Sequence, residues 1–153
     1  MLRIFKPSLA LVLLIPLVLG APSLARADDF DGHFEVSLID PGPDHLYAIL
    51  LQGTVSFLGD VFGLGGARFD RETGEVSDGQ LSLIDGNGDH VLIDFAGEID
   101  IDPETGDPYL IGQFSIVGGD GAWEGISGDG ILMSNSPYDA PIPIDLQGTF
   151  TLP

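Results

Sequence analysis

The stretch that decides the fold is VLIDFAGEIDI, Val91–Ile101. Its odd positions carry Val91, Ile93, Phe95, Ile99 and Ile101, and its even positions include Asp94, Glu98 and Asp100. Successive side chains of a β-strand point to opposite faces of a sheet, so this alternation predicts a strand with one buried and one solvated face. The three carboxylates are expected to point to water.

The same period of two recurs along the chain, and no long stretch after residue 27 has the spacing of an amphipathic helix. Further strands are predicted at His33–Ile39, Leu46–Leu58, Gly66–Asp70, Val76–Ile84, Tyr109–Val117, Gly130–Ser134 and Asp145–Leu152. About eight short strands separated by turn signals are typical of an all-β sandwich or barrel. The chain has no cysteine, and a closed sheet protects a disulfide-free protein from edge pairing. We therefore expect an antiparallel β-barrel.

Tight turns separate several of these predicted strands. FDRETGEV (residues 69–76) and IDPETGDP (residues 101–108) share the pattern D-x-E-T-G. The Asp and Thr side chains can bond their own backbone in such turns, and Gly74 and Gly106 can adopt a positive φ. Gly53, inside the long second strand, is expected to allow a bend or a bulge.

The first 27 residues differ from the rest. Arg3 and Lys6 precede an apolar run from Leu9 to Gly20 that leads into Ala25-Arg26-Ala27, which is typical of a secretory signal peptide with an A-x-A cleavage site. The run is shorter than the roughly 20 residues that cross a bilayer. We predict a cleaved signal peptide at 1–27, one domain at 28–153, and a secreted or periplasmic product with no membrane association after cleavage.

Charge restricts the partners. All 24 acidic residues follow residue 27, and the only basic residues in the same part of the sequence are two arginines. The formal charge of residues 28–153 is therefore −22. Such a field repels nucleic acid, excludes it as a partner, and favours diffuse association with cations. Oligomeric state is left open.

Sites for chemistry are scarce in the sequence. Ser127 is not in a G-x-S-x-G elbow, and His33, His45 and His90 lack the spacing of zinc ligands. The turn Asp85–Asp89 resembles the start of an EF-hand, but His90 and Ala96 stand where glycine and glutamate are required. Asp85, Asn87 and Asp89 are thus weak candidates, no metal site is predicted, and no cofactor is expected.

The predicted inner face is apolar and suits a small hydrophobic ligand. The alternative is a barrel whose middle is filled by side chains. The candidate lining residues are Tyr47, Ile49, Leu51, Val55, Phe57, Phe95, Phe114 and Trp123.

The stretch FSIVGGDGAWEGISGDGIL, Phe114–Leu132, contains six glycines around the single tryptophan. It lacks the patterns of nucleotide loops and calcium repeats, so we interpret it as a tight corner that folds Trp123 over the end of the core. Together with the N-G-D turn at 87–89, it resembles a motif of small secreted bacterial proteins similar to the allene oxide cyclase and dirigent class. The matching positions are Asn87, Gly88, Asp89, Phe114, Ile116, Gly118, Gly119, Gly121, Trp123, Gly125, Gly128 and Gly130.

This resemblance covers residues 85–132, and Asp120 and Ile126 depart from it by replacing threonine and alanine. It implies an eight-stranded antiparallel barrel, often with an interior pocket, and transfers no catalytic residues. The leading hypothesis is a secreted, cofactor-free barrel that binds a small apolar molecule or acts as an accessory protein, without enzymatic activity. The alternatives are a dirigent- or cyclase-like isomerase that confines a reactive intermediate, and an extracellular matrix or surface protein associated with divalent cations.

Overall fold

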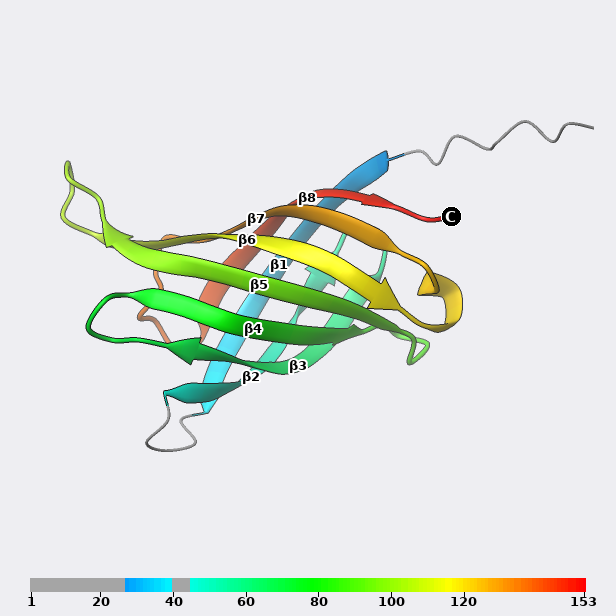
Figure 1. The fold of residues 1–153 in the computed structure, drawn as a ribbon, viewed down its shortest axis with the longest axis horizontal. Coiled ribbons are helices and arrows are strands. Elements are labelled where there is room, and N and C mark those ends of the chain that lie inside the picture. The colour runs from blue at the N-terminus through cyan, green and yellow to red at the C-terminus, as the bar shows by residue number, and fades with distance from the viewer. Residues whose placement is uncertain (1–26, 40–44) are drawn as a thin grey trace, which may run out of the picture.

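The structure is a computed structural model that describes residues 27–39 and 45–153. These residues form a closed barrel of eight antiparallel strands (Figure 1), which confirms the predicted fold class. The predicted signal peptide lies outside the described residues apart from Ala27. The strands are β1 Ala27–Ile39, β2 Leu46–Val55, β3 Gly59–Phe69, β4 Glu75–Ile84, β5 His90–Ile101, β6 Pro108–Gly119, β7 Ser127–Ser134 and β8 Ile142–Thr151, with a 3₁₀ turn η1 at Gly121–Trp123.

Strand order in the barrel follows the order of the sequence. Each strand pairs with the next one, and β1 closes the cylinder by pairing with both β2 and β8. Phe34, for example, lies opposite Gly53 on one side and Ile144 on the other. Within the described residues every strand pairs with two neighbours, which is the property expected for a disulfide-free β-protein.

The inward and outward faces follow the predicted alternation. Along β5, Val91 and Ile93 are buried while Asp94 and Glu98 are exposed. Ile101 departs from the prediction, because it lies at the last position of the strand and is 53% exposed. The remainder of the pattern places the apolar core inside the cylinder.

Several predicted strand boundaries were wrong. β2 ends at Val55 and not at Leu58, because the Leu58 amide donates to the Val55 carbonyl in a tight turn. Gly59 follows that turn with a φ of 73° and begins β3, seven residues before the predicted Gly66. The sequence did not reveal this turn because Phe57, which lies in the turn, is apolar and packs against the core like a strand residue.

Strands β1 and β7 also begin earlier than predicted. β1 starts at Ala27 instead of His33, because its first residues pair with the end of β8. β7 starts at Ser127 instead of Gly130, paired with Thr151. Polar and glycine residues hid both extensions, since backbone pairing does not require apolar side chains.

Gly53 does not produce the expected bulge. The register between β1 and β2 runs through it without a shift. A Cβ at this position would overlap the carbonyl oxygen of His33 on the neighbouring strand, so glycine permits close approach of two backbones. A register shift occurs instead between β5 and β6, where Leu92 pairs with Gly118 and Ile93 with Ile116.

The two ends of the barrel have different connections (Figure 1). We call one the Trp123 end, which comprises residues 56–58, 85–89 and 120–126 between strands. The opposite one is the Arg71 end, which comprises residues 70–74, 102–107 and 135–141. Both D-x-E-T-G turns belong to the Arg71 end.

The D-x-E-T-G turns have the predicted hydrogen bonds. Asp70 Oδ1 accepts from the amides of Glu72 and Thr73, and Gly74 has a φ of 79°. Asp102 and Gly106 repeat the arrangement in the other turn. The backbone bonds lower the pKa of Asp70 below its ordinary value.

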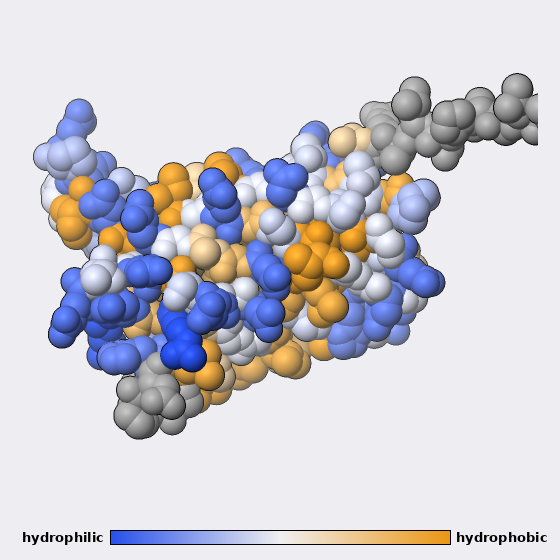
Figure 2. Space-filling view, viewed as in Figure 1, coloured by the Kyte–Doolittle hydropathy of each residue, from blue (hydrophilic) through white to orange (hydrophobic). Residues whose placement is uncertain are grey.

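The outer wall is acidic but not uniformly polar. Figure 2 shows apolar side chains among the hydrophilic ones on the face it displays. Leu50 on β2 pairs with Leu64 on β3, and both are exposed. Within residues 27–39 and 45–153, no helix has the length and hydropathy required to span a membrane.

Candidate functional site: an apolar pocket at the Arg71 end

The Trp123 end is filled by aromatic side chains from five different segments of the chain. Phe57 stacks on Phe150 with ring centroids 3.9 Å apart, and it meets Trp123 edge-on at 5.1 Å. Phe30 contacts both Phe57, at 5.5 Å, and Phe114, at 5.1 Å. Aromatic rings bury a large area and interlock in these tilted and edge-to-face geometries. This end is therefore closed by packing.

Hydrogen bonds hold the tryptophan in place. Trp123 Nε1 donates to Asp85 Oδ2 at 3.1 Å, and Asp85 Oδ1 accepts from the amides of Asn87 and Asp89. The indole bond, followed by the two amide bonds, holds the pKa of Asp85 below its ordinary value. Asp89 Oδ2 in turn accepts from the amide of Ala122. The β4–β5 turn and the 120–126 connection are thus tied together.

Glycine is required where these two segments touch. Gly121 has a φ of 55°, and a Cβ on it would overlap the carboxylate of Asp89. Gly125, in the same connection, has a φ of 81°. The glycine-rich stretch is therefore a tight corner that places Trp123 on the core, as its sequence predicts.

The weak metal candidates occupy this turn. Asp85 is buried, and its two carboxylate oxygens accept three hydrogen bonds from N–H groups. Within the part of the chain that the structure describes, no group of three or more His, Asp or Glu side chains is placed to hold a metal ion. The turn uses Asp85 and Asp89 as hydrogen-bond acceptors for the Trp123 end.

An interior pocket of about 110 Å³ lies toward the Arg71 end. Its lining residues are Phe34, Val36, Leu38, Tyr47, Ile49, Leu51, Ala67, Phe69, Val76, Leu81, Ile93, Phe95, Ile99, Leu110, Phe114, Leu132, Pro137, Ile142, Ile144 and Leu146. Of these side chains Tyr47 alone is polar. The pocket is consequently suited to an apolar molecule.

The structure divides the predicted lining residues between the two ends. Those that line the pocket are Tyr47, Ile49, Leu51, Phe95 and Phe114. The others, Val55, Phe57 and Trp123, belong to the filled Trp123 end instead. They differ because β2 runs from the Arg71 end to the Trp123 end, so residues of one inner face lie at different depths.

Sequence reasoning missed fifteen of the pocket residues, and six of these lie on β1 and β8. Phe34 and Val36 alternate with exposed residues on β1, and Ile144 and Leu146 do the same on β8. Their period of two was a usable signal. Pro137, by contrast, lies in the 135–141 connection, where no periodic pattern indicates a direction.

A polar contact lies beside the pocket at the Arg71 end. The Arg71 Nε–H donates to Tyr47 Oη at 3.0 Å, and the guanidinium carbon lies 5.7 Å from the centre of the Tyr47 ring. Arg71 belongs to the first D-x-E-T-G turn, whereas Tyr47 is the second residue of β2. The contact therefore joins residues 24 positions apart in sequence.

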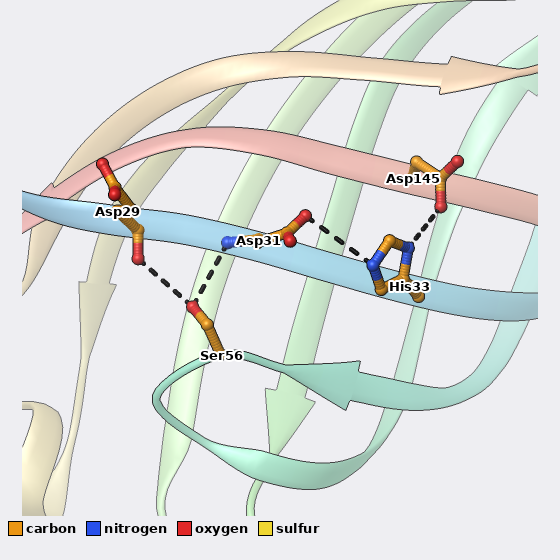
Figure 3. Close-up of polar contacts among 5 residues, drawn as sticks. All are labelled: Asp29, Asp31, His33, Ser56 and Asp145. Atoms are coloured by element: carbon orange, nitrogen blue, oxygen red, sulfur yellow. Dashed lines mark hydrogen bonds and ion pairs between the residues drawn. The ribbon is translucent and has the colours of Figure 1, made fainter.

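A second cluster of titratable groups lies on the outer wall. His33 on β1 has its Nδ1 2.6 Å from Asp145 Oδ1 and its Nε2 3.8 Å from Asp31 Oδ1 (Figure 3). The hydrogen bond to Asp145, with the charges of both carboxylates, raises the pKa of His33. Nearby, the Ser56 hydroxyl donates to the Asp29 carbonyl. The His33 and Asp145 side chains are more than half exposed and border an open, shallow hollow on the outer wall.

The three histidines do not form a common site. His90 is partly buried, with Nδ1 2.9 Å from Ser82 Oγ, and His45 is exposed before β2. Ser127, excluded as a nucleophile from its sequence context, contacts Thr151 through its hydroxyl at 3.1 Å.

No family model matches the chain, and no curated protein or solved structure is significantly similar to it. The barrel implied by the resemblance to the allene oxide cyclase and dirigent class is observed. Membership of that class stays a prediction.

Proposed function

We propose that this protein is an exported, cofactor-free barrel that binds a small apolar molecule in the pocket at the Arg71 end. The observation that carries the proposal is the contrast within one cylinder. The Trp123 end is packed with aromatic rings, whereas about 110 Å³ at the Arg71 end is empty and lined by apolar side chains. Protein interiors are normally filled to crystal-like density, so a void of this size is unusual in a structural barrel.

Pocket size limits the ligand. An engineered apolar cavity of about 150 Å³ stays dry and binds benzene, while typical sites for drug-sized ligands enclose about 300–1,000 Å³. At about 110 Å³, the interior pocket accommodates a body of roughly one ring. The phenylalanines around it, Phe34, Phe69, Phe95 and Phe114, favour an aromatic body because rings attract one another edge to face.

Export is supported by the N-terminal sequence alone, since residues 1–26 lie outside the described residues. The basic residues, apolar run and A-x-A site at residues 3–27 support a cleaved leader. N-terminal sequencing of the protein produced by its natural host tests this. We expect Asp28 as the first residue, and an N-terminus at Met1 would contradict export.

Ligand binding is tested by filling the pocket. Ala67 on β3 is buried and lines the pocket, whereas Ala48 on β2 is exposed on the outer wall. We expect thermal shifts and calorimetry with one-ring aromatics and small terpenoids to show saturable binding to the wild type and to Ala48→Leu. Ala67→Leu places three additional carbon atoms in the pocket and should abolish binding.

The proposal fails if no compound of these classes binds the wild type. It also fails if Ala67→Leu and Ala48→Leu bind alike, because binding would then occur outside the pocket.

The two alternative functions have less support. A cyclase or dirigent-like reaction requires polar groups beside the confined intermediate, and Tyr47 is the single polar side chain among the described residues that line the pocket. A matrix role organised by divalent cations draws its support from net charge, and the carboxylates of the most suggestive turn, Asp85 and Asp89, are engaged with N–H groups.

A further inference from the structure

We infer that the ligand carries one neutral hydrogen-bond acceptor, such as a ketone or aldehyde carbonyl, and that the Tyr47 hydroxyl binds this group at the Arg71 end of the pocket. The inference rests on the proposed function and deepens it. The ligand class is therefore a small aromatic or alicyclic carbonyl compound, with its ring among the phenylalanines and its oxygen toward Tyr47.

The direction of the bond between Arg71 and Tyr47 leaves one proton available. A guanidinium can only donate hydrogen bonds, so Tyr47 Oη is the acceptor in its 3.0 Å contact with Arg71 Nε. The hydroxyl proton is not used in that bond. Within the described residues the Tyr47 hydroxyl has no other hydrogen bond, so its O–H can donate to a ligand.

The burial of the Tyr47 hydroxyl increases its tendency to pair with an acceptor on a ligand. Tyr47 is only 6% exposed and belongs to the apolar lining. A donor enclosed in such surroundings is strongly favoured to pair with an acceptor, because solvent reaches it poorly. The donated bond from the positively charged Arg71 also polarises the hydroxyl and makes it a better donor.

The charges around the pocket favour a neutral ligand over a carboxylate. Arg71 is already engaged by the Tyr47 oxygen and ring. The connections of the Arg71 end carry the exposed carboxylates of Asp70, Glu72, Glu104, Asp107 and Asp139. An anion would approach against this field and would lose its hydration in an apolar pocket.

The interior pocket borders a second hollow at the Arg71 end. A surface hollow next to Arg71 shares five lining residues with the interior pocket: Val36, Leu38, Phe69, Pro137 and Ile142. The two spaces therefore lie next to one another and share part of their apolar wall. A ligand whose ring occupies the interior can extend its polar group toward Tyr47 without entering the packed Trp123 end.

The test is a binding cycle between two ligands and two proteins. Acetophenone and α-methylstyrene have nearly the same planar shape, but only acetophenone carries a carbonyl oxygen. Calorimetry is carried out with the wild type and with Tyr47→Phe, which retains the ring and removes the hydroxyl. Comparing each ligand with itself across the two proteins cancels the difference in ligand hydration.

We expect Tyr47→Phe to weaken acetophenone binding about threefold to tenfold, the net value of one hydrogen bond, and to change α-methylstyrene binding less than twofold. Equal effects of Tyr47→Phe on both ligands would overturn the inference while leaving the proposed function intact. Failure of both ligands and of the wider aromatic panel to bind the wild type would overturn both. Benzoate is the third arm, and tighter binding of benzoate than of acetophenone would overturn the neutral class.

A spectroscopic measurement keeps the inference testable if Tyr47→Phe does not fold. The carbonyl stretching frequency of acetophenone bound to the wild type should be lower than that of acetophenone in an alkane, because a donated hydrogen bond weakens the C=O bond. A frequency equal to the alkane value would overturn the inference.

Discussion

The Trp123 end and the Arg71 end belong to the same eight strands and the same alternating pattern, yet one is filled and the other is hollow. The connections account for the difference. At the Trp123 end the connections turn aromatic rings inward: Phe57 from residues 56–58 and Trp123 from residues 120–126. At the Arg71 end the D-x-E-T-G turns fold their carboxylates onto their own backbone. A barrel wall therefore does not decide whether its interior is solid or hollow, because the loops at its ends supply the final volume.

The largest expected effect tests the packing of the two ends. Phe30→Ala removes a ring that is 1% exposed and touches Phe57 and Phe114. We expect a loss of about 3–5 kcal/mol in the free energy of unfolding, the usual cost of a large cavity in a packed core. Phe69→Ala is the matched change beside the pocket, where the ring is partly exposed, and should cost roughly half of that or less.

Urea unfolding monitored by circular dichroism measures both variants. Equal losses in the two variants would contradict the difference in packing between the ends.

Enlarging a buried side chain should cost stability at the packed Trp123 end and little at the pocket. Val91 is fully buried near the Trp123 end, so Val91→Leu is expected to overpack the core and cost about 1–3 kcal/mol. Ala67→Leu places its additional carbons in the pocket and should change stability by less than about 1 kcal/mol in either direction. The same unfolding experiment applies, and a loss for Ala67→Leu as large as that for Val91→Leu would show that the pocket has no usable space.

The tie between the indole and the β4–β5 turn predicts an acid-dependent contribution. The pKa of Asp85 is lowered in the fold, chiefly by the hydrogen bond from Trp123. This contribution is present above the ordinary aspartate pKa of about 4 and is lost as pH falls through the lowered value. Trp123→Phe removes it.

Thermal melts between pH 7 and pH 2.5 should therefore show a stability gap between wild type and Trp123→Phe that narrows below about pH 4. The comparison cancels the general effect of titrating the other carboxylates. A gap that stays constant over the whole range would show that the Asp85 bond contributes nothing to closing this end.

The smallest effect on stability is expected from the His33–Asp145 contact, which lies on the outer wall and belongs to neither end of the barrel. The pKa of His33 is raised, first by its hydrogen bond to Asp145. The stabilisation is fully present below the ordinary histidine pKa of about 6.5 and disappears as pH rises through the raised value. Because more than half of each side chain is exposed, at 61% and 52%, we expect almost no change in melting temperature.

The measurement is an NMR titration of the His33 ring. Asp145→Asn should lower the pKa of His33, and the control Asp31→Asn should lower it less, because Asp31 lies 3.8 Å away against 2.6 Å for Asp145. A larger shift from Asp31→Asn would contradict the geometry.

The sequence predicted the wall better than the ends. Alternation located the strands and the outward carboxylates of β5, because a period of two is a local property that any strand must show. The turn after Val55 was missed because Phe57 continues the apolar run while facing the core from a loop. Similarly, Val55, Phe57 and Trp123 were grouped with the pocket residues, since the pattern reports which face a side chain occupies and not its depth along the barrel.

By itself, the sequence determined the class of fold, the polarity of each face, the two D-x-E-T-G turns and the glycine corner that carries Trp123. These depend on residues a few positions apart. Tertiary structure alone decided which end is hollow and that Arg71 meets Tyr47 beside the pocket. A cavity is the small difference between the volume enclosed by eight strands and the volume of side chains contributed from all of them, and no local pattern contains that difference.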